Sequence, residues 1–268
     1  MRTIRMAIML IGTILLGGGS LASAHPDLID PQASSARVAV MKSFPGAVIR
    51  DWQPAPMPGL YMFTLNNDER IFFVDESGQY LLAQAALFDM KEQKNLTQEF
   101  IMGKRRELLA AVPLQDAILY RPSELAPGMR ESAPVLVFDD PDCPFCRELH
   151  AEVKQLVEAG VPVAVFLHPV ERLHKGAIQK SINIWCSDNR QDMLDTALAG
   201  KPVPDAGKPC DAPLEHNLQL ARQLGGGPTP YIVFPDGRTV AGKKSAAELM
   251  AMLGMPPTVA QQLGSVSR

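Results

Sequence analysis

Residues 135–146 read Val-Leu-Val-Phe-Asp-Asp-Pro-Asp-Cys-Pro-Phe-Cys, and this stretch decides the fold. Its first four residues are apolar and rich in valine, which predicts a buried strand. Residues 143–159 repeat apolar side chains at helical spacing and stop at Gly160, which predicts an amphipathic helix. A Cys-x-x-Cys pair that opens a helix directly after a buried strand is typical of proteins that exchange thiols and disulfides.

The position of the cysteine pair has a chemical purpose. Cys143 lies where the unpaired N–H groups and the positive dipole of a helix N-terminus stabilise a thiolate, so we expect its pKa to lie below the free value of about 8.5. Pro144 suits the first helical turn because it has no N–H to satisfy. The spacing brings Cys146 close enough to form a disulfide with Cys143, and Cys146 can thus resolve a mixed disulfide on Cys143.

Charged residues beside the motif act on Cys143 in opposite directions. The carboxylates of Asp139, Asp140 and Asp142 raise the pKa of a nearby thiol, whereas the guanidinium of Arg147 lowers it. The balance between them sets the reduction potential, which the sequence leaves open.

Two other interpretations of the cysteine pair are a purely structural disulfide and half of a zinc site. A zinc site is disfavoured because Cys186 and Cys210 are too far apart for zinc-finger spacing and no histidine falls at that spacing. We therefore expect redox chemistry by the cysteines themselves, with no metal and no cofactor.

Cys186 and Cys210 can pair with each other. Cys186 ends a predicted helix and Cys210 follows a segment rich in Pro and Gly. Such a bridge closes a loop of roughly 25 residues, for which chain entropy gives about 3 to 4 kcal/mol. A structural disulfide is favoured over a second redox pair, because these cysteines lack the Cys-x-x-Cys spacing and any electropositive neighbourhood.

Outward from the motif, the C-terminal half alternates strands and helices. Strands are predicted at 161–167, 231–234 and 239–240, and a last helix at 245–253. This alternation indicates an α/β domain. The segment 225–230 is a loop before a strand, and a trans bond at Pro230 is the expectation from composition alone.

The N-terminal third has a different organisation. A helix predicted to start at Ser34 or Ser35 runs through Val38 and Met41 to Phe44, and strands follow at 60–65, 70–74 and 80–83. A unit this small buries only a modest fraction of its surface, so we expect it to form a dimer interface.

A helix predicted over 97–112 joins the two parts, with Thr97 as its N-cap and Pro113 after its end. Its run Lys104-Arg105-Arg106 is interpreted as a solvent-exposed face rather than a polyanion site.

The composition and the N-terminal sequence limit where the protein can be located in the cell and which partners it can have. The chain has 268 residues and a net charge of -3, which argues against nucleic acid as a partner. Two arginines, a short apolar run and the sequence Ala22-Ser23-Ala24 predict a signal peptide over 1–24 that is cleaved after Ala24. The apolar run is too short for a membrane anchor, so we expect an exported protein in an environment where disulfides persist.

These features together resemble the DsbC/DsbG family of periplasmic thiol:disulfide isomerases, over nearly the whole mature chain. The resemblance rests on the Cys143–Cys146 motif with the following Glu-Leu-His, on Ile-Trp-Cys ending at Cys186, on Cys210, on Thr229-Pro230 and on Gln-Pro-Ala-Pro at 53–56. It implies an α+β two-domain chain. A cystatin-like N-terminal dimerisation domain is expected over 25–92, a linker helix over 93–115, a thioredoxin fold with a helical insertion over 116–254 and a flexible tail over 255–268.

The resemblance also implies roles for residues. Cys143 and Cys146 form the redox-active pair, Cys186 and Cys210 the structural disulfide, and Thr229 and a cis-Pro230 bind the backbone of the substrate. Pro-Phe between the active cysteines is closer to DsbG, whereas the second cysteine pair is closer to DsbC, which we favour. Val137 stands where thioredoxin has a buried acid, so we expect that internal proton acceptor to be absent.

The expected function is a V-shaped homodimer in the periplasm that reshuffles wrong disulfides in exported proteins and is kept reduced by a DsbD-like membrane thiol reductant. Two alternatives remain: a DsbG-like reductase of sulfenylated cysteines, favoured slightly by Pro144, and a periplasmic chaperone with secondary redox activity.

Overall fold

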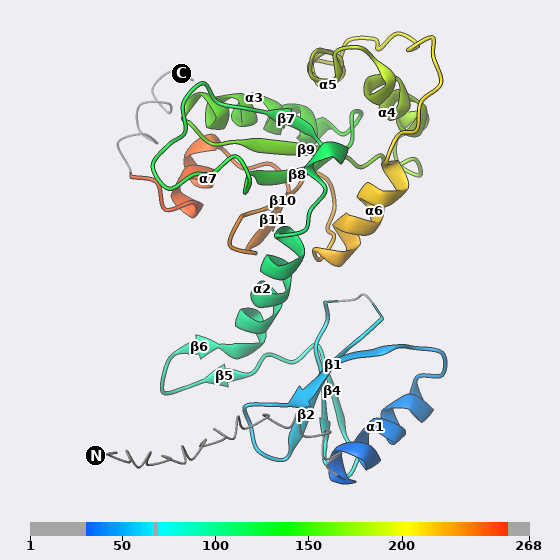
Figure 1. Ribbon diagram of the computed structural model, residues 1–268, viewed down its shortest axis with the longest axis vertical. Helices are drawn as coiled ribbons and strands as arrows, with labels where there is room; N and C mark the ends of the chain where they lie inside the picture. Colours follow the sequence, from blue (N-terminus) through cyan, green and yellow to red (C-terminus); the bar gives the residue numbers. More distant parts are fainter. Residues whose placement is uncertain (1–30, 67–68, 257–268) are drawn as a thin grey trace, which may run out of the picture.

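The computed structural model describes residues 31–66 and 69–256. These residues form an N-terminal domain and a C-terminal domain that are joined by one helix (Figure 1). The predicted signal peptide and residues 257–268 of the predicted tail lie outside the described residues.

The N-terminal domain packs one helix against an antiparallel sheet. The sheet has the order β1-β2-β3-β4 and consists of β1 (Ile49–Pro54), β2 (Leu60–Leu65), β3 (Phe72–Asp75) and β4 (Leu81–Ala83). Helix α1 (Pro31–Ser43) covers one face of the sheet. The core between them consists of Ala36 and Val40 from the helix with Tyr61, Phe63, Leu65, Phe72 and Val74 from the sheet.

The N-terminal helix and the first strand differ from the predictions. Helix α1 begins at Pro31, upstream of the serines predicted to cap it. Val38 and Met41, two of the apolar residues on which the helix prediction rested, are exposed. Strand β1 was missed because it is largely polar and irregular: Asp51 has a φ of 53° and the pairing with β2 shifts register between Arg50 and Gln53.

The linker helix α2 (Leu96–Leu109) follows a small hairpin of β5 (Phe88–Asp89) and β6 (Lys94–Asn95). Its N-cap is Asn95, whose side chain accepts from the backbone N–H of Gln98. Thr97, the predicted cap, instead accepts a hydrogen bond from the N–H of Leu87. The first turns of α2 pack Phe100 against the face of the N-terminal sheet that α1 leaves free.

The C-terminal domain is built on a five-stranded sheet of order β11-β10-β8-β9-β7. Its strands are β7 (Ile118–Tyr120), β8 (Val135–Asp139), β9 (Val163–Leu167), β10 (Tyr231–Val233) and β11 (Thr239–Ala241), and a 3-10 turn η1 (Leu114–Asp116) precedes them. Only β8 and β9 pair in parallel, as a βαβ unit around α3 (Pro144–Glu158). The edge strand β7 was missed because three residues give too short a pattern.

Helices cover both faces of this sheet (Figure 1). On one face, α3 and α7 (Ala246–Met252) enclose the larger core with Val135 and Val137 of β8. On the other face, α6 (Leu214–Gln223) and the end of α2 pack on Leu136 and Phe138. The side chains of β8 therefore alternate strictly between two cores. A helical insertion of α4 (Ala177–Cys186) and α5 (Arg190–Leu198) follows β9.

The basic run on α2 is only partly a solvent-exposed face: Arg106 is exposed as predicted, but Arg105 is buried, which corrects the prediction at that position. Arg105 is buried, and its Nε and Nη2 donate to the Glu69 carboxylate at 2.7 and 2.5 Å. Its Nη1 donates to Gly237 O at 3.1 Å and to Thr239 Oγ1 at 3.2 Å. Lys104 pairs with Asp51 at 2.9 Å. The charges of this run therefore hold both domains to the linker helix.

Candidate active site

The motif cysteines lie at the start of α3, directly beyond the end of β8. Cys143 is the N-cap residue of α3 and Pro144 is in its first turn, as the sequence predicts. Both cysteines are unbonded. Cys143 keeps 4% of its surface exposed, whereas Cys146 is fully buried one turn further on. Cys143 is therefore the more accessible cysteine of the pair, and Cys146 is shielded from solvent.

The loop before β10 completes the surroundings of Cys143. The thiol of Cys143 donates to the carbonyl oxygen of Thr229 at 3.5 Å. The Thr229-Pro230 peptide bond is cis, and Pro230 is buried while Thr229 is partly exposed. The structure thus brings together three of the residues that the family resemblance singles out, from segments 86 positions apart in the chain.

Asp140 fixes the loop that leads into the motif. Its carboxylate is fully buried and accepts hydrogen bonds from the N–H of Asp142 at 2.8 Å, the N–H of Val170 at 2.7 Å and the ring of His174 at 2.9 Å. Asp142 in turn forms ion pairs with Arg147 and Lys180. The loop is therefore tied to the insertion on one side and to α3 on the other.

A second polar network joins α3 to the insertion behind the motif. Asp195 of α5 accepts hydrogen bonds from the Tyr120 hydroxyl at 2.7 Å and the His150 ring at 2.8 Å, and pairs with Lys154 at 2.8 Å. Burial alone raises the pKa of Asp195, but the hydrogen bonds from Lys154 and Tyr120 reverse this and lower it. Burial lowers the pKa of His150. The network holds a carboxylate in its charged form.

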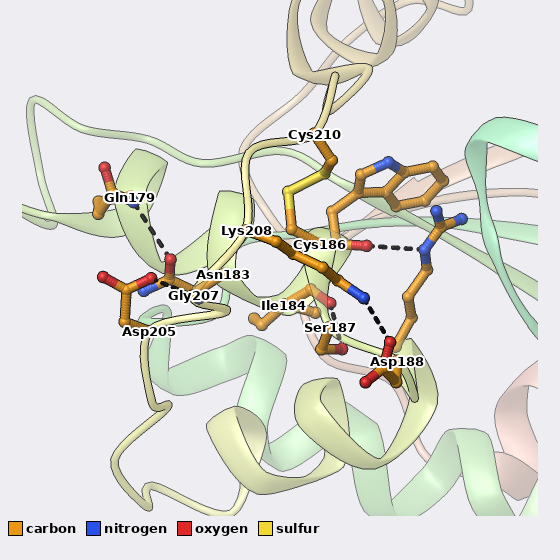
Figure 2. Close-up of a disulfide and its surroundings, with 12 residues drawn as sticks. Gln179, Asn183, Ile184, Cys186, Ser187, Asp188, Asp205, Gly207, Lys208 and Cys210 are labelled. Atoms are coloured by element: carbon orange, nitrogen blue, oxygen red, sulfur yellow. Dashed lines mark hydrogen bonds and ion pairs between the residues drawn. A yellow bond between two sulfur atoms is a disulfide. The ribbon is translucent and has the colours of Figure 1, made fainter.

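Cys186 and Cys210 form a disulfide in the structure, with their Cα atoms 5.6 Å apart (Figure 2). The bond ties the end of α4 to the segment that leads towards α6. An ion pair between Lys208 and Asp188 runs alongside it. Cys186 belongs to the same core as the motif cysteines, so the bridge anchors the insertion to the body of the domain.

The described residues hold no group of three or more His, Cys, Asp or Glu side chains arranged to bind a metal ion.

Comparisons with known proteins agree with this site. Residues 126–255 match the model of a thioredoxin-like domain, and residues 25–98 match the disulfide bond isomerase protein N-terminal domain. The probable thiol:disulfide interchange protein DsbC of Bordetella parapertussis is 30% identical over 84% of this chain and 75% of its own length. The chain belongs to the DsbC family of thiol:disulfide interchange proteins.

Other members of the DsbC family and one solved structure are also similar. DsbC of Salmonella typhimurium is 28% identical over 86% of this chain and 88% of its own length. A disulfide interchange protein from Neisseria gonorrhoeae is 33% identical over 53% of this chain and 96% of its own, with a TM-score of 0.45.

Membership of the DsbC family confirms the expected α+β organisation, with an isomerase-type N-terminal domain and a thioredoxin-like C-terminal domain. It also confirms a thiol:disulfide oxidoreductase of the thioredoxin superfamily. The N-terminal family supports a homodimer. Among the described helices, none has the length and apolar character needed to cross a bilayer.

The sequence analysis named Asp139 as a charge near the motif but did not place it in the core of this DsbC-family site. Val137 does lack an acidic side chain, but Asp139, two residues on, is fully buried on the same face of β8. Burial raises the pKa of Asp139 to about 7. Period-two alternation from Val135 and Val137 was the signal that could have placed Asp139 beside the cysteines rather than in the loop.

Proposed function

We propose that the chain is an exported disulfide isomerase in which Cys143 is the nucleophile and Cys146 the resolving thiol. The observation that carries this proposal is the pairing of a cysteine at a helix N-cap, which keeps 4% of its surface exposed, with a fully buried cysteine in the first turn of that helix. A thiol at a helix N-terminus favours its thiolate form, and the thiolate is the species that attacks disulfides.

The proposed reaction starts when Cys143 attacks a wrong disulfide in a client protein and forms a mixed disulfide. A client thiol can then displace Cys143, which reshuffles the client without net redox change. Alternatively, Cys146 displaces the client, which leaves the client reduced and the motif oxidised. A membrane thiol reductant of the DsbD type is the proposed source of electrons that restores the motif.

Thr229 and Pro230 are proposed to bind the extended backbone of the client. The loop lies against Cys143, and Thr229 keeps part of its surface open to solvent. Phe145, between the two cysteines, exposes 59% of its surface and offers an apolar contact. Cys186 and Cys210 are proposed to act structurally, because both lie outside this loop and are already bonded.

The dimer is proposed to form at the free edge of the N-terminal sheet. Strand β4 pairs only with β3, so its other edge presents unpaired backbone groups. Apolar side chains of β4 and the residue before it are exposed, with Tyr80 at 68%, Leu81 at 38% and Leu82 at 49%. An apolar edge of this kind is stabilised when a second copy pairs with it.

Residues 1–24 are proposed to direct export to the periplasm, where the Cys186–Cys210 bond would persist. The proposed division of the mature chain is a dimerisation domain over 25–92, a linker over 93–115 and a catalytic domain over 116–254.

The test uses a client protein with scrambled disulfides and catalytic amounts of the reduced mature chain. We expect recovery of client activity with the intact protein, loss with Cys143→Ser, and loss with Leu82→Lys if that change yields a monomer by light scattering. No recovery by the intact protein, with its thiols confirmed reduced, would exclude isomerisation.

The same samples separate the two alternatives. Reduction of a sulfenylated protein without repair of scrambled disulfides would indicate a DsbG-like reductase, for which Pro144 is the motivating residue. Suppression of client aggregation by Cys143→Ser would indicate a chaperone, for which the exposed apolar residues are the motivation.

A further inference from the structure

Asp139 has the environment of a functional group rather than a structural one. It is the last residue of β8, its side chain is fully buried, and both carboxylate oxygens lack a hydrogen-bond partner among the described residues. A buried charge without partners destabilises a fold. The neighbouring Asp140 shows the contrast, since its equally buried carboxylate accepts three hydrogen bonds.

The carboxylate of Asp139 faces the resolving thiol. Side chains of β8 alternate, and Val135 and Val137 lie in the same core cluster as Cys143 and Cys146, so Asp139 points to that side as well. The Cys146 thiol and the Asp139 carboxylate are close enough to interact electrostatically. No water-exposed atom lies on Cys146 itself, which is 0% exposed.

Burial of Cys146 creates a chemical requirement. The thiol must lose its proton before its sulfur can attack. Burial is the main cause that raises the pKa of Cys146, and the negative charge of Asp139 raises it further. Solvent has no direct access to the thiol. A proton acceptor inside the core would remove this barrier.

We propose that Asp139 is the internal proton acceptor for Cys146 in the resolving step. This inference rests on the proposed thiol–disulfide exchange by Cys143 and Cys146. The proton moves from Cys146 Sγ to an Asp139 oxygen, and the Cys146 thiolate attacks Cys143 Sγ in the mixed disulfide. The Cys143–Cys146 bond forms, the bond from Cys143 to the client sulfur breaks, and the client leaves as a thiolate that takes its proton from water. The client disulfide gains two electrons and the motif loses two.

The surroundings of Asp139 suit this role. The backbone N–H of Asp140 provides a hydrogen bond that favours the Cys146 thiolate once it forms. The other ionisable groups around Asp139 are Asp140, the residue directly after β8, Cys143 at the N-cap of α3 and Tyr120 from β7. Strand β9 is entirely apolar, and Tyr231 of β10 packs in the opposite core. None of these groups is a cation that would hold Asp139 permanently charged.

The experiment separates the two thiols by stopped flow. Reduced protein is mixed with 5,5′-dithiobis(2-nitrobenzoic acid), and release of the coloured thiol is followed from pH 5 to 10. The first release depends on reagent concentration and reports attack by Cys143, whereas the second does not and reports attack by Cys146. In the wild type we expect the second rate to rise through pH 7, where Asp139 loses its proton.

In Asp139→Asn we expect the second rate to fall at least about tenfold at pH 7 and to recover only in alkaline solution. The first rate should change by less than about threefold. The matched control is Asp142→Asn, which removes a negative charge near the motif but should keep the inflection near pH 7. Equal slowing of both steps by Asp139→Asn, or an unchanged second rate, would overturn the proposal.

A measurement on the wild type keeps the proposal testable if Asp139→Asn does not fold. The carboxyl carbon of Asp139, followed by NMR in reduced protein with labelled aspartate, should titrate at the same pH as the second rate. A carboxyl group that titrates below pH 5 would overturn the proposal. Absence of the first release from reduced wild type would instead refute the proposed function of Cys143.

Discussion

Arg105 on the linker helix and Glu69 in the N-terminal domain form a two-pronged ion pair, with the guanidinium donating to both carboxylate oxygens. The same guanidinium donates to Gly237 O in the C-terminal domain. Arg105 is 6% exposed, so solvent screens this pair little. One side chain therefore links both domains to the helix between them.

The first prediction concerns this link. Arg105→Met should lower the free energy of unfolding by about 1–3 kcal/mol, because Glu69 and Gly237 lose hydrogen bonds from a charged donor. Arg105→Lys should not restore the pair, since an ammonium lacks the two-pronged geometry. Small-angle X-ray scattering should show a wider range of domain orientations in both variants. Scattering identical to that of the wild type would mean that packing of α2 alone fixes the domains.

The second prediction concerns Asp195. Asp195→Ala leaves the buried Tyr120 hydroxyl and the His150 ring without their acceptor and should cost about 2–3 kcal/mol. The loss should appear in urea unfolding and as faster amide exchange in α5. Asp195→Asn, which keeps one acceptor oxygen, should cost less. Equal effects of the two changes would show that charge, rather than hydrogen bonding, is what the network requires.

The third prediction concerns the second disulfide. Replacing Cys186 and Cys210 together by serine should lower stability by about 3–4 kcal/mol, as expected for a loop of this length. Below the new melting temperature, the first reaction of Cys143 with a disulfide reagent should keep its rate. A loss of that reaction in folded variant protein would assign this pair a redox role instead.

The fourth prediction is a pH dependence of stability in the reduced protein. The pKa of Asp139 is raised from 3.8 to about 7 by burial, so the folded state binds this proton more tightly than the unfolded state. The stabilisation is present below pH 3.8 and is lost as the pH rises to 7, with an upper bound of about 4 kcal/mol. The Asp139→Asn variant lacks this term. Relative to wild type, it should gain stability between pH 4 and 7 in urea unfolding, and a constant difference would contradict the raised pKa.

The sequence determined the elements whose patterns are long or whose chemistry is local. Helix α3 was predicted within a residue at each end because its apolar spacing, Pro144 and Gly160 all act within the helix itself. The Cys-x-x-Cys motif was equally visible, since its reactivity depends on neighbours two or three positions away. Strand β1 was missed because its sequence is largely polar and its pairing with β2 is irregular. Strand β7 was missed because pairing with the distant strand β9, rather than a pattern within its own three residues, makes it a strand.

Charged residues show where sequence reasoning ended. A charge on a helix is usually solvated, yet Arg105 is buried by partners 36 and 132 positions away. In the same way Asp139, which reads as one of three acidic residues before the motif, lies in the core beside Cys146. Local patterns fixed which residues could react and which segments were helical. Only the tertiary structure decided which charged side chains are buried, because the desolvation of a side chain depends on every segment that packs against it.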